Sequence, residues 1–298
     1  MRVYLDCLPC FLRQALDASR RVSDDEQTQH RVLRAVCAAV PGFSLDATPI
    51  DLGREVHRIV RETLGVDDPY LEAKRRDNAR AVALLPELRQ RITVCPDPIR
   101  MALRLAALGN AIDLGVYSSV DIEREIEHGL GDGKELTDYP LFKERLEQVD
   151  NVLYLGDNAG EIAFDRLVVE QLGRLGKRVT FVVRGRPILN DVTLEDAQSV
   201  NMHDVAEVIS SGADGPGTVL HRCSPEFVKS FGQAGLILSK GQGNFEGLSE
   251  ACGPLFFLLK AKCPVVAREL GVAVGDMVLR AQRDDHGDTG VAESNTTG

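Results

Sequence analysis

The stretch from Val152 to Glu161 constrains the fold of this chain more than any other part of the sequence. It begins with a short apolar run, Val152 to Leu155, whose length and flanking residues are typical of a buried β-strand. The polar pair Asp157-Asn158 follows where the strand should end, and residues 161–169 then carry apolar side chains at helical spacing. A strand, a tight polar turn and a helix form half of a βαβ unit. In open α/β sheets, ligands bind beyond the carboxyl ends of such strands.

The C-terminal half of the chain repeats this alternation of short apolar runs and helical segments. The β-type runs lie at residues 152–155, 179–183, 205–210, 236–239 and 264–267. Helical segments are predicted between them, at residues 162–175, 194–200, 225–233 and 254–260. Strands that alternate with helices indicate a parallel sheet covered on both faces. We therefore expect a Rossmann-like three-layer α/β/α domain, an α/β fold, over residues 146–281.

The N-terminal half shows helical spacing, which predicts a predominantly α-helical domain over residues 1–145. A Gly- and Asp-rich connection, residues 129–140, is the best candidate for the boundary between the two domains. Three polar residues of the helical half, Asn78, Asn110 and Asp113, are candidates for substrate contacts, although helix capping is the alternative for each. Residues 282–298 are polar and without periodicity, which is typical of a disordered tail.

Composition excludes several classes of protein. The 298 residues carry a net charge of −10, which argues against a nucleic-acid partner because phosphate binding requires a concentrated basic face. No segment reaches the length of a membrane span, and residues 1–6 do not resemble a signal peptide, so we expect a cytoplasmic protein without a membrane partner. The sequence does not indicate an oligomeric state.

Three oxygen-bearing side chains follow the first two predicted strands. Asp157 and Asn158 come directly after the first, and Asp191 follows the second within a polar cluster. Two carboxylates and a carboxamide form a hard ligand set that suits Mg²⁺ or Mn²⁺ better than zinc and leaves positions for water and phosphate. The alternatives are a plain Asp-Asn turn and, for Asp191, the cap of the next helix.

A glycine-rich segment follows the strand predicted at residues 236–239. It begins with Lys240 and continues through Gly241, Gly243 and Asn244. Glycines let backbone N–H groups approach an anion, and the lysine supplies a positive charge, so the segment is a candidate phosphate site. It is not a P-loop because the lysine precedes the glycines. An ordinary turn is the alternative.

The chain has seven cysteines, and only Cys7 and Cys10 show motif spacing, as C-x-x-C. A single C-x-x-C lacks the second pair that would define a structural zinc site. Cys263 or Cys95 is a candidate third ligand if the fold brings it near. Packing within the structure is the alternative for these cysteines.

Four motifs together resemble one known family, the damage-control phosphatases, formerly called domain of unknown function 89. The motifs are Leu155-Gly156-Asp157-Asn158-Ala159-Gly160-Glu161, Asn190-Asp191-Val192-Thr193, Ser239-Lys240-Gly241-Gln242-Gly243-Asn244-Phe245-Glu246 and Lys260-Ala261-Lys262-Cys263-Pro264-Val265. The chain is most similar to the short, mainly prokaryotic and archaeal branch, which also begins with a C-x-x-C. The likeness extends from Leu5 to about Leu279.

The resemblance implies a metal-dependent phosphatase that hydrolyses phosphate monoesters of small metabolites, such as sugar phosphates or damaged phospho-metabolites. It places a divalent cation (Mg²⁺, Mn²⁺, Co²⁺ or Ni²⁺) on Asp157, Asn158 and Asp191. It also implies an acidic substrate-site residue at Glu161, a substrate loop from Lys240 to Asn244 and a phosphate-contacting lysine at Lys260. The chain departs from its relatives at Ser211, where asparagine is common, and this departure bears on substrate selectivity.

The sequence does not choose between two nucleophiles, and it allows two rival functions. The nucleophile is either water, with Asp157 or Glu161 as the base, or Asp157 itself, which would form an aspartyl-phosphate. The first rival is a carboxyl methyltransferase that uses S-adenosylmethionine. It is disfavoured because Arg184 stands where such enzymes carry an acidic ribose contact. The second rival is a non-enzymatic protein that binds metal or metabolites.

Overall fold

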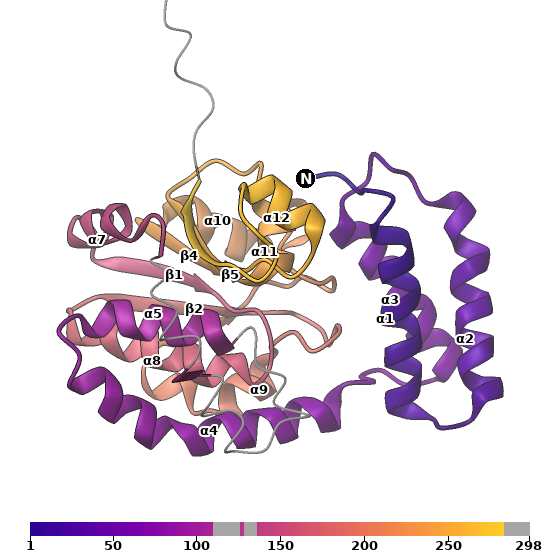
Figure 1. Cartoon of the computed structure of the whole chain (residues 1–298), viewed down its shortest axis with the longest axis horizontal. Coiled ribbons are helices and arrows are strands. Elements are labelled where there is room, and N and C mark those ends of the chain that lie inside the picture. Colours follow the sequence, from indigo (N-terminus) through magenta and orange to yellow (C-terminus); the bar gives the residue numbers. More distant parts are fainter. Residues whose placement is uncertain (110–125, 128–135, 283–298) are drawn as a thin grey trace, which may run out of the picture.

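The computed structural model describes residues 1–109, 126–127 and 136–282, and the architecture below refers to these residues. Asn110, Asp113, most of the connection at residues 129–140 and the tail from residue 283 lie outside this part of the chain. The chain begins with a group of helices, α1 (Cys7–Val22), α2 (Glu26–Ala39) and α3 (Pro49–Leu64), which we call the helical lobe. Figure 1 shows the lobe at one end of the molecule, facing one edge of the sheet.

Local sequence signals set the ends of the lobe helices. Asp25 caps α2 by accepting hydrogen bonds from the backbone N–H groups of Gln27 and Thr28. Thr48 caps α3, and Gly65 ends it in the left-handed conformation with φ of 67°. The inward faces of these helices form a small core of their own, which is separate from the cores of the sheet. Its buried members are Val3, Phe11, Ala15, Ala18, Val32, Val36, Leu52, Val56, Val60 and Tyr70.

The sheet has the strand order β3-β2-β1-β4-β5-β6 in the described part of the chain. Its strands are β1 (Asn151–Leu155), β2 (Arg178–Val183), β3 (Glu207–Ser210), β4 (Leu236–Lys240), β5 (Leu255–Lys260) and β6 (Met277–Ala281). The first five are parallel, and β6 pairs antiparallel with β5. The chain reverses its direction across the sheet beside β1, with β2 and β3 on one side and β4 on the other. Ligand sites of open α/β folds form at this topological switch point.

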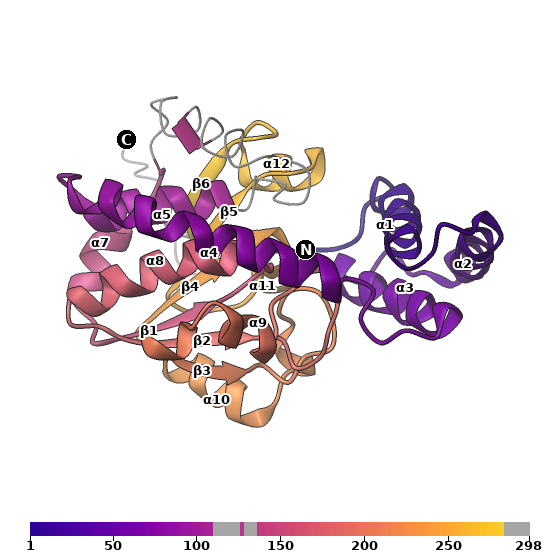
Figure 2. The same ribbon diagram turned by 90° about the horizontal axis from the view of Figure 1, so that it is seen from below.

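Helices cover both faces of the sheet, as Figures 1 and 2 show. One face packs against α4 (Leu71–Thr93), α5 (Pro98–Gly109), α7 (Tyr139–Glu147), α8 (Glu161–Arg174) and α9 (Leu194–Ser199). The other face packs against α10 (Pro225–Gln233), α11 (Gly241–Leu248) and α12 (Pro264–Leu270). Val152 and Tyr154 of β1 point into the first core, and Leu153 and Leu155 point into the second. The expected three-layer α/β/α architecture is confirmed.

Two elements near the C-terminus are the reverse of the sequence-based prediction. Residues 254–260, expected as a helix, form strand β5, and residues 264–267, expected as a strand, lie in helix α12. The run Leu255–Leu259 is buried on both sides because β5 is an interior strand, so it lacks the alternation that marks a half-buried strand. Cys263 caps α12 and Pro264 occupies its first turn, a helix-start signal that the prediction missed. Strand β6 was not predicted.

The helices α4, α5 and α7 share one hydrophobic core with the sheet. The division between hydrophobic cores therefore falls in the linker between α3 and α4, near residues 65–70. The domain boundary at residue 145 stays a prediction. Within the described ranges, no helix is both long and apolar enough to cross a membrane.

Candidate metal and phosphate site

A cavity of about 230 Å³ lies beyond the carboxyl ends of β1, β2 and β4, between the sheet and the helical lobe. The sheet side contributes Asp157, Asn158, Leu189, Asp191, Pro216, Gly217, Gln242, Gly243, Glu246 and Lys262. The lobe contributes Phe11, Gln14, Pro49, Ile50 and Gly53. The cavity therefore has a polar floor on the sheet and a mixed wall on α1 and α3.

The loops after β1 and β2 are joined directly to each other. Asn158 and Asp191 form an isolated antiparallel bridge. The Ala159 N–H donates to the Asn190 carbonyl at 2.8 Å, and the Val192 N–H donates to the Asp157 carbonyl at 2.8 Å. These backbone hydrogen bonds hold the three oxygen-bearing side chains at the same edge of the sheet, where all three line the cavity.

The carboxylates of this edge lie close together in buried surroundings. The Asn158 amide donates to Asp157 Oδ2 and to Glu161 Oε1, both at 2.8 Å. Burial raises the pKa of Asp157, and the negative charges of Glu161 and Asp191 raise it further. Burial also raises the pKa of Asp191. Concentrated carboxylates with a carboxamide beside them are suited to a hard divalent cation, which would offset their mutual repulsion. The residues present therefore fit the metal that the sequence predicts.

Arg184, at the start of the loop after β2, is the residue that sequence reasoning missed. It is 1% exposed. Its guanidinium donates to Asp191 Oδ2 at 2.7 Å, to Asn244 Oδ1 at 3.0 Å and to Thr218 Oγ1 at 3.3 Å. It therefore fixes the orientation of Asp191 from behind the cavity. The available signal was a charged residue directly after a buried strand, where a partner is required.

Lys240 does not reach the cavity. Its side chain is fully buried, and its ammonium pairs with Asp165 at 2.9 Å and with Glu161 at 3.3 Å. Burial disfavours the ammonium, but the carboxylates of Asp165 and Glu161 outweigh that effect and raise the pKa of Lys240. The Tyr154 hydroxyl donates to the same oxygen of Asp165, Oδ1, at 2.7 Å. Like Lys240, Glu161 is absent from the cavity lining and lies behind Asn158.

The glycine-rich segment forms the first turn of α11 rather than a free turn. Gly241 has φ of 79°, and a Cβ atom at this position would collide with the Asp157 carboxylate. Gly243 lines the cavity, whereas Asn244 is fully buried and donates to the carbonyls of Gly156 and Lys240. The segment therefore brings the N-terminus of α11 against Asp157 at the carboxyl edge of the sheet, and Asn244 ties together the ends of β1 and β4.

The two lysines of the last motif, Lys260 and Lys262, differ in their position relative to the cavity. Lys262 lines the cavity, and its positive charge acts against the rise in the pKa of Asp157. Lys260 ends β5 opposite Met277 and is not among the residues that line the cavity. Ser211 is buried and accepts a hydrogen bond from the Ala213 N–H at 3.3 Å, so it too lies away from the cavity.

The cysteines of the C-x-x-C lie at the start of α1. All seven cysteines of the chain lie in its described part and are free thiols. Cys10 accepts a hydrogen bond from the Gln14 amide at 3.5 Å, and Cys263 accepts one from the Gln242 amide at 3.6 Å. Among the described residues, no group of three or more His, Cys, Asp or Glu side chains is arranged to hold a metal ion.

The fold and the site together define a Rossmann-like α/β protein with a candidate divalent-cation site at its switch point. A family model described as the damage-control phosphatase ARMT1-like domain matches residues 3–278. The chain belongs to this family.

Relatives in three archaea show how closely the chain resembles other members. It is 37% identical to an uncharacterized protein from Methanocaldococcus jannaschii, over 94% of this chain and 95% of that one. It is 34% identical to a damage-control phosphatase from Archaeoglobus fulgidus, over 94% and 99% of the two chains. A damage-control phosphatase from Pyrococcus horikoshii is 33% identical, over 93% of this chain and 97% of that one.

A solved structure is similar over the whole fold. The crystal structure of a protein of the domain of unknown function 89 family from Pyrococcus horikoshii, at 2.04 Å resolution, superposes with a TM-score of 0.89 and 33% sequence identity. The match covers 95% of this chain and 100% of that one. The helical lobe is therefore included in the similarity.

Proposed function

We propose that this protein is a metal-dependent phosphatase that hydrolyses phosphate monoesters of small metabolites. The observation that carries the proposal is the convergence of Asp157, Asn158 and Asp191 in one cavity at the switch point of the sheet. The names of two relatives, each more than 90% covered by the match, support the reaction class. The cavity volume of about 230 Å³ lies below the roughly 300–1,000 Å³ of typical ligand pockets, which supports a small ester.

Each residue of the cavity floor has a role in this proposal. Asp157, Asn158 and Asp191 hold the divalent cation. When bound, the cation neutralises the charge of the transferring phosphoryl group. Lys262 attracts the phosphate from the rim, and the backbone N–H groups at the start of α11 favour an anion beside Gly243.

The position of Asp157 supports its assignment to the chemical step. Asp157 lines the cavity, whereas Glu161 lies behind Asn158 and pairs with Lys240. Asp157 therefore acts either as the base that takes a proton from water or as the nucleophile itself. In both routes, Glu161 and Lys240 serve as the charged support of the floor.

The buried Arg184 argues against the methyltransferase alternative. Methyltransferases of Rossmann type carry an acidic ribose contact after the second strand. Here that position holds a guanidinium committed to Asp191, Thr218 and Asn244.

Release of inorganic phosphate from a panel of sugar phosphates and p-nitrophenyl phosphate tests the proposal. Mg²⁺, Mn²⁺, Co²⁺ and Ni²⁺ are compared with a chelator, using wild type and Asp157→Ala. Asp150→Ala serves as the matched control because Asp150 lies at the opposite end of β1 and is exposed. Turnover that depends on metal, is lost in Asp157→Ala and is retained in Asp150→Ala supports the function. Equal turnover in wild type and Asp157→Ala contradicts it.

A further inference from the structure

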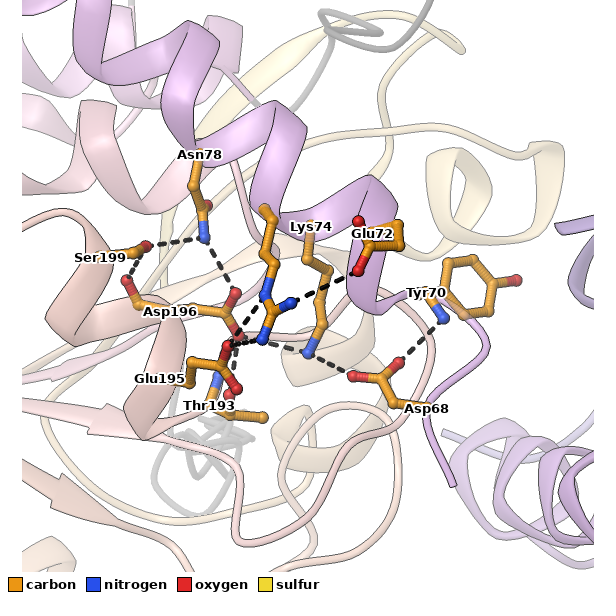
Figure 3. Close-up of polar contacts among 10 residues, drawn as sticks. Asp68, Tyr70, Glu72, Lys74, Asn78, Thr193, Glu195, Asp196 and Ser199 are labelled. Carbon is orange, nitrogen blue, oxygen red and sulfur yellow. Dashed lines mark hydrogen bonds and ion pairs between the residues drawn. The ribbon is translucent and has the colours of Figure 1, made fainter. Parts of the chain in front are cut away.

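Asn78 of helix α4 contacts the loop that carries Asp157 and Asn158, and it also contacts helix α9, which follows the Asp191 loop. Asn78 is 2% exposed and does not line the cavity. Its Oδ1 accepts a hydrogen bond from the Gly160 N–H at 2.6 Å. Its Nδ2 donates to Asp196 Oδ1 at 2.9 Å and to Ser199 Oγ at 3.0 Å. Figure 3 shows Asn78 pointing from α4 toward Asp196 and Ser199 of α9.

The first contact is with the loop that carries Asp157 and Asn158. Gly160 is the N-cap of α8 and has φ of 78°, a conformation that is costly for other residues. Its N–H group is buried and points to Asn78 rather than into a helix or strand. The hydrogen bond therefore holds the end of the loop, two residues after Asn158, against α4.

The second contact is with the segment that follows Asp191. Asp196 Oδ2 accepts hydrogen bonds from the Thr193 N–H at 2.9 Å and from the Thr193 hydroxyl at 2.8 Å, which forms the capping box of α9. Thr193 lies two residues after Asp191. The amide of Asn78 donates to the other oxygen of the same carboxylate, so this carboxylate connects Asn78 to the Asp191 loop.

Lys74, one turn earlier on α4, supplies the charge that makes this arrangement stable. Its ammonium lies 3.3 Å from Asp196 Oδ2 and 2.9 Å from Asp68 Oδ2. Asp68 belongs to the linker between the helical lobe and α4, and Figure 3 shows Lys74 between the two carboxylates. The buried Asp196 is therefore neutralised by Lys74, which leaves its Oδ1 to bind Asn78.

We propose that Asn78 is a positioning residue of the metal site, which fixes the spacing between the Asp157-Asn158 loop and the Asp191 loop. This inference rests on the proposed function, because it concerns the affinity of the same site for its cation. Asn78 touches neither the cavity nor a proposed ligand side chain, and it acts through Gly160 on one side and through Asp196 on the other. An asparagine is suited to this task because one amide offers an acceptor and a donor at once.

Calorimetric titration of Mn²⁺ into wild type, Asn78→Ala and Asn78→Asp tests the proposal, with thermal unfolding measured for each protein without metal. Removing an outer partner of a metal site typically weakens affinity about 10- to 100-fold, and we expect a loss of this size in Asn78→Ala. Asn78→Asp keeps an acceptor for the Gly160 N–H but places a second carboxylate beside Asp196. We therefore expect Asn78→Asp to unfold at a lower temperature than Asn78→Ala. We also expect Asn78→Asp to bind Mn²⁺ more tightly than Asn78→Ala does.

The matched control is Arg89→Met on the same helix. Arg89 makes a two-pronged ion pair with Glu170 of α8, at 2.7 and 2.9 Å, at the other end of α4. Its removal breaks a polar contact between α4 and the sheet domain without touching either ligand loop. We expect a lower unfolding temperature and an unchanged Mn²⁺ affinity.

The outcomes separate the inference from the proposed function. Wild-type affinity in Asn78→Ala, or affinity losses that follow the order of the stability losses across all variants, would overturn the positioning role. A wild-type protein that binds no Mn²⁺ in the same titration would contradict the proposed function itself. Selective loss in Asn78→Ala, with Arg89→Met unaffected, supports the inference.

Discussion

Arg184 Nε lies 2.7 Å from Oδ2 of Asp191, and both side chains are buried. The guanidinium also lies 4.0 Å from Asp157 Oδ1. It therefore offsets part of the carboxylate repulsion that the cation would otherwise have to balance alone.

This pair predicts a large loss of stability in Arg184→Met. Breaking a buried ion pair by removing one partner costs about 3–5 kcal/mol, because the remaining charge is left without compensation. Urea unfolding without metal measures the loss. Arg222→Met is the control, since the Arg222–Asp51 pair is about one-third exposed on the arginine side and should contribute less than about 1 kcal/mol. Equal losses in the two variants would contradict the role of Arg184.

Gly241→Ala should weaken metal binding and phosphate release more than the backbone strain of the substitution alone would. The added Cβ atom would collide with the Asp157 carboxylate and displace it from the cavity. Gly176→Ala is a matched control because Gly176 has a similar φ of 76°, but an added Cβ atom would have no other heavy atom within 4 Å. Left-handed backbone at a residue with a side chain costs about 1–2 kcal/mol in both variants.

Phosphate release and Mn²⁺ binding distinguish the two glycine variants. We expect both to fall strongly in Gly241→Ala and to stay near the wild-type level in Gly176→Ala. Retention of activity and Mn²⁺ affinity in Gly241→Ala would show that Asp157 does not need its observed position.

The two lysines of the last motif give opposite predictions. Lys262 lines the cavity and Lys260 does not, so Lys262→Met should lose more transition-state stabilisation than Lys260→Met. Removing one group that stabilises developing negative charge costs about 10²–10³ in kcat, and we expect a loss toward the lower end for a residue at the rim. Steady-state kinetics of the two Met variants measures the difference. A larger loss in Lys260→Met would support the assignment implied by the family resemblance.

His57 gives the lobe a pH-dependent stability. Burial, together with the positive charge of Arg61, lowers the pKa of His57 to about 4, while the pKa of an unfolded histidine lies near 6.5. The unfolded state therefore binds more protons between these values, so the stability contributed here is present above about pH 6.5 and is lost as the pH falls toward 4.

Urea unfolding between pH 5 and pH 7.5 tests this expectation. At pH 5, His57 should lower the free energy of unfolding of wild type by about 2 kcal/mol, since each pH unit below 6.5 costs about 1.36 kcal/mol. His57→Gln should lack that part of the pH dependence, whereas His30→Gln, which changes an exposed histidine, should keep it. Parallel pH profiles for wild type and His57→Gln would contradict the assignment.

Much of the sheet could be predicted because its signals are local. The run Val152–Leu155 and the polar pair after it give the strand, the turn and the edge at which a ligand binds. The sequence-based prediction assigned helix to strand β5 and strand to helix α12. The reason is that a doubly buried strand shows no alternation, so only length and flanking residues distinguish it from a helix.

The candidate site could be predicted in part, for the same reason. Asp157, Asn158 and Asp191 follow strand ends, and parallel strands bring such ends to one edge. The partners of Arg184, Lys240 and Asn78 lie 7 to 121 residues away along the chain in the contacts that define their roles. Such pairings depend on tertiary packing, which no local pattern in one sequence encodes.

The position of the bound cation is the most direct test of the proposed metal site at Asp157, Asn158 and Asp191. Anomalous diffraction at the manganese edge, from crystals grown with Mn²⁺, locates the metal without reference to activity. We expect a peak in the cavity, in contact with oxygen atoms of Asp157, Asn158 and Asp191. A peak at Cys7 and Cys10 instead, or no peak in the cavity at saturating Mn²⁺, would contradict it.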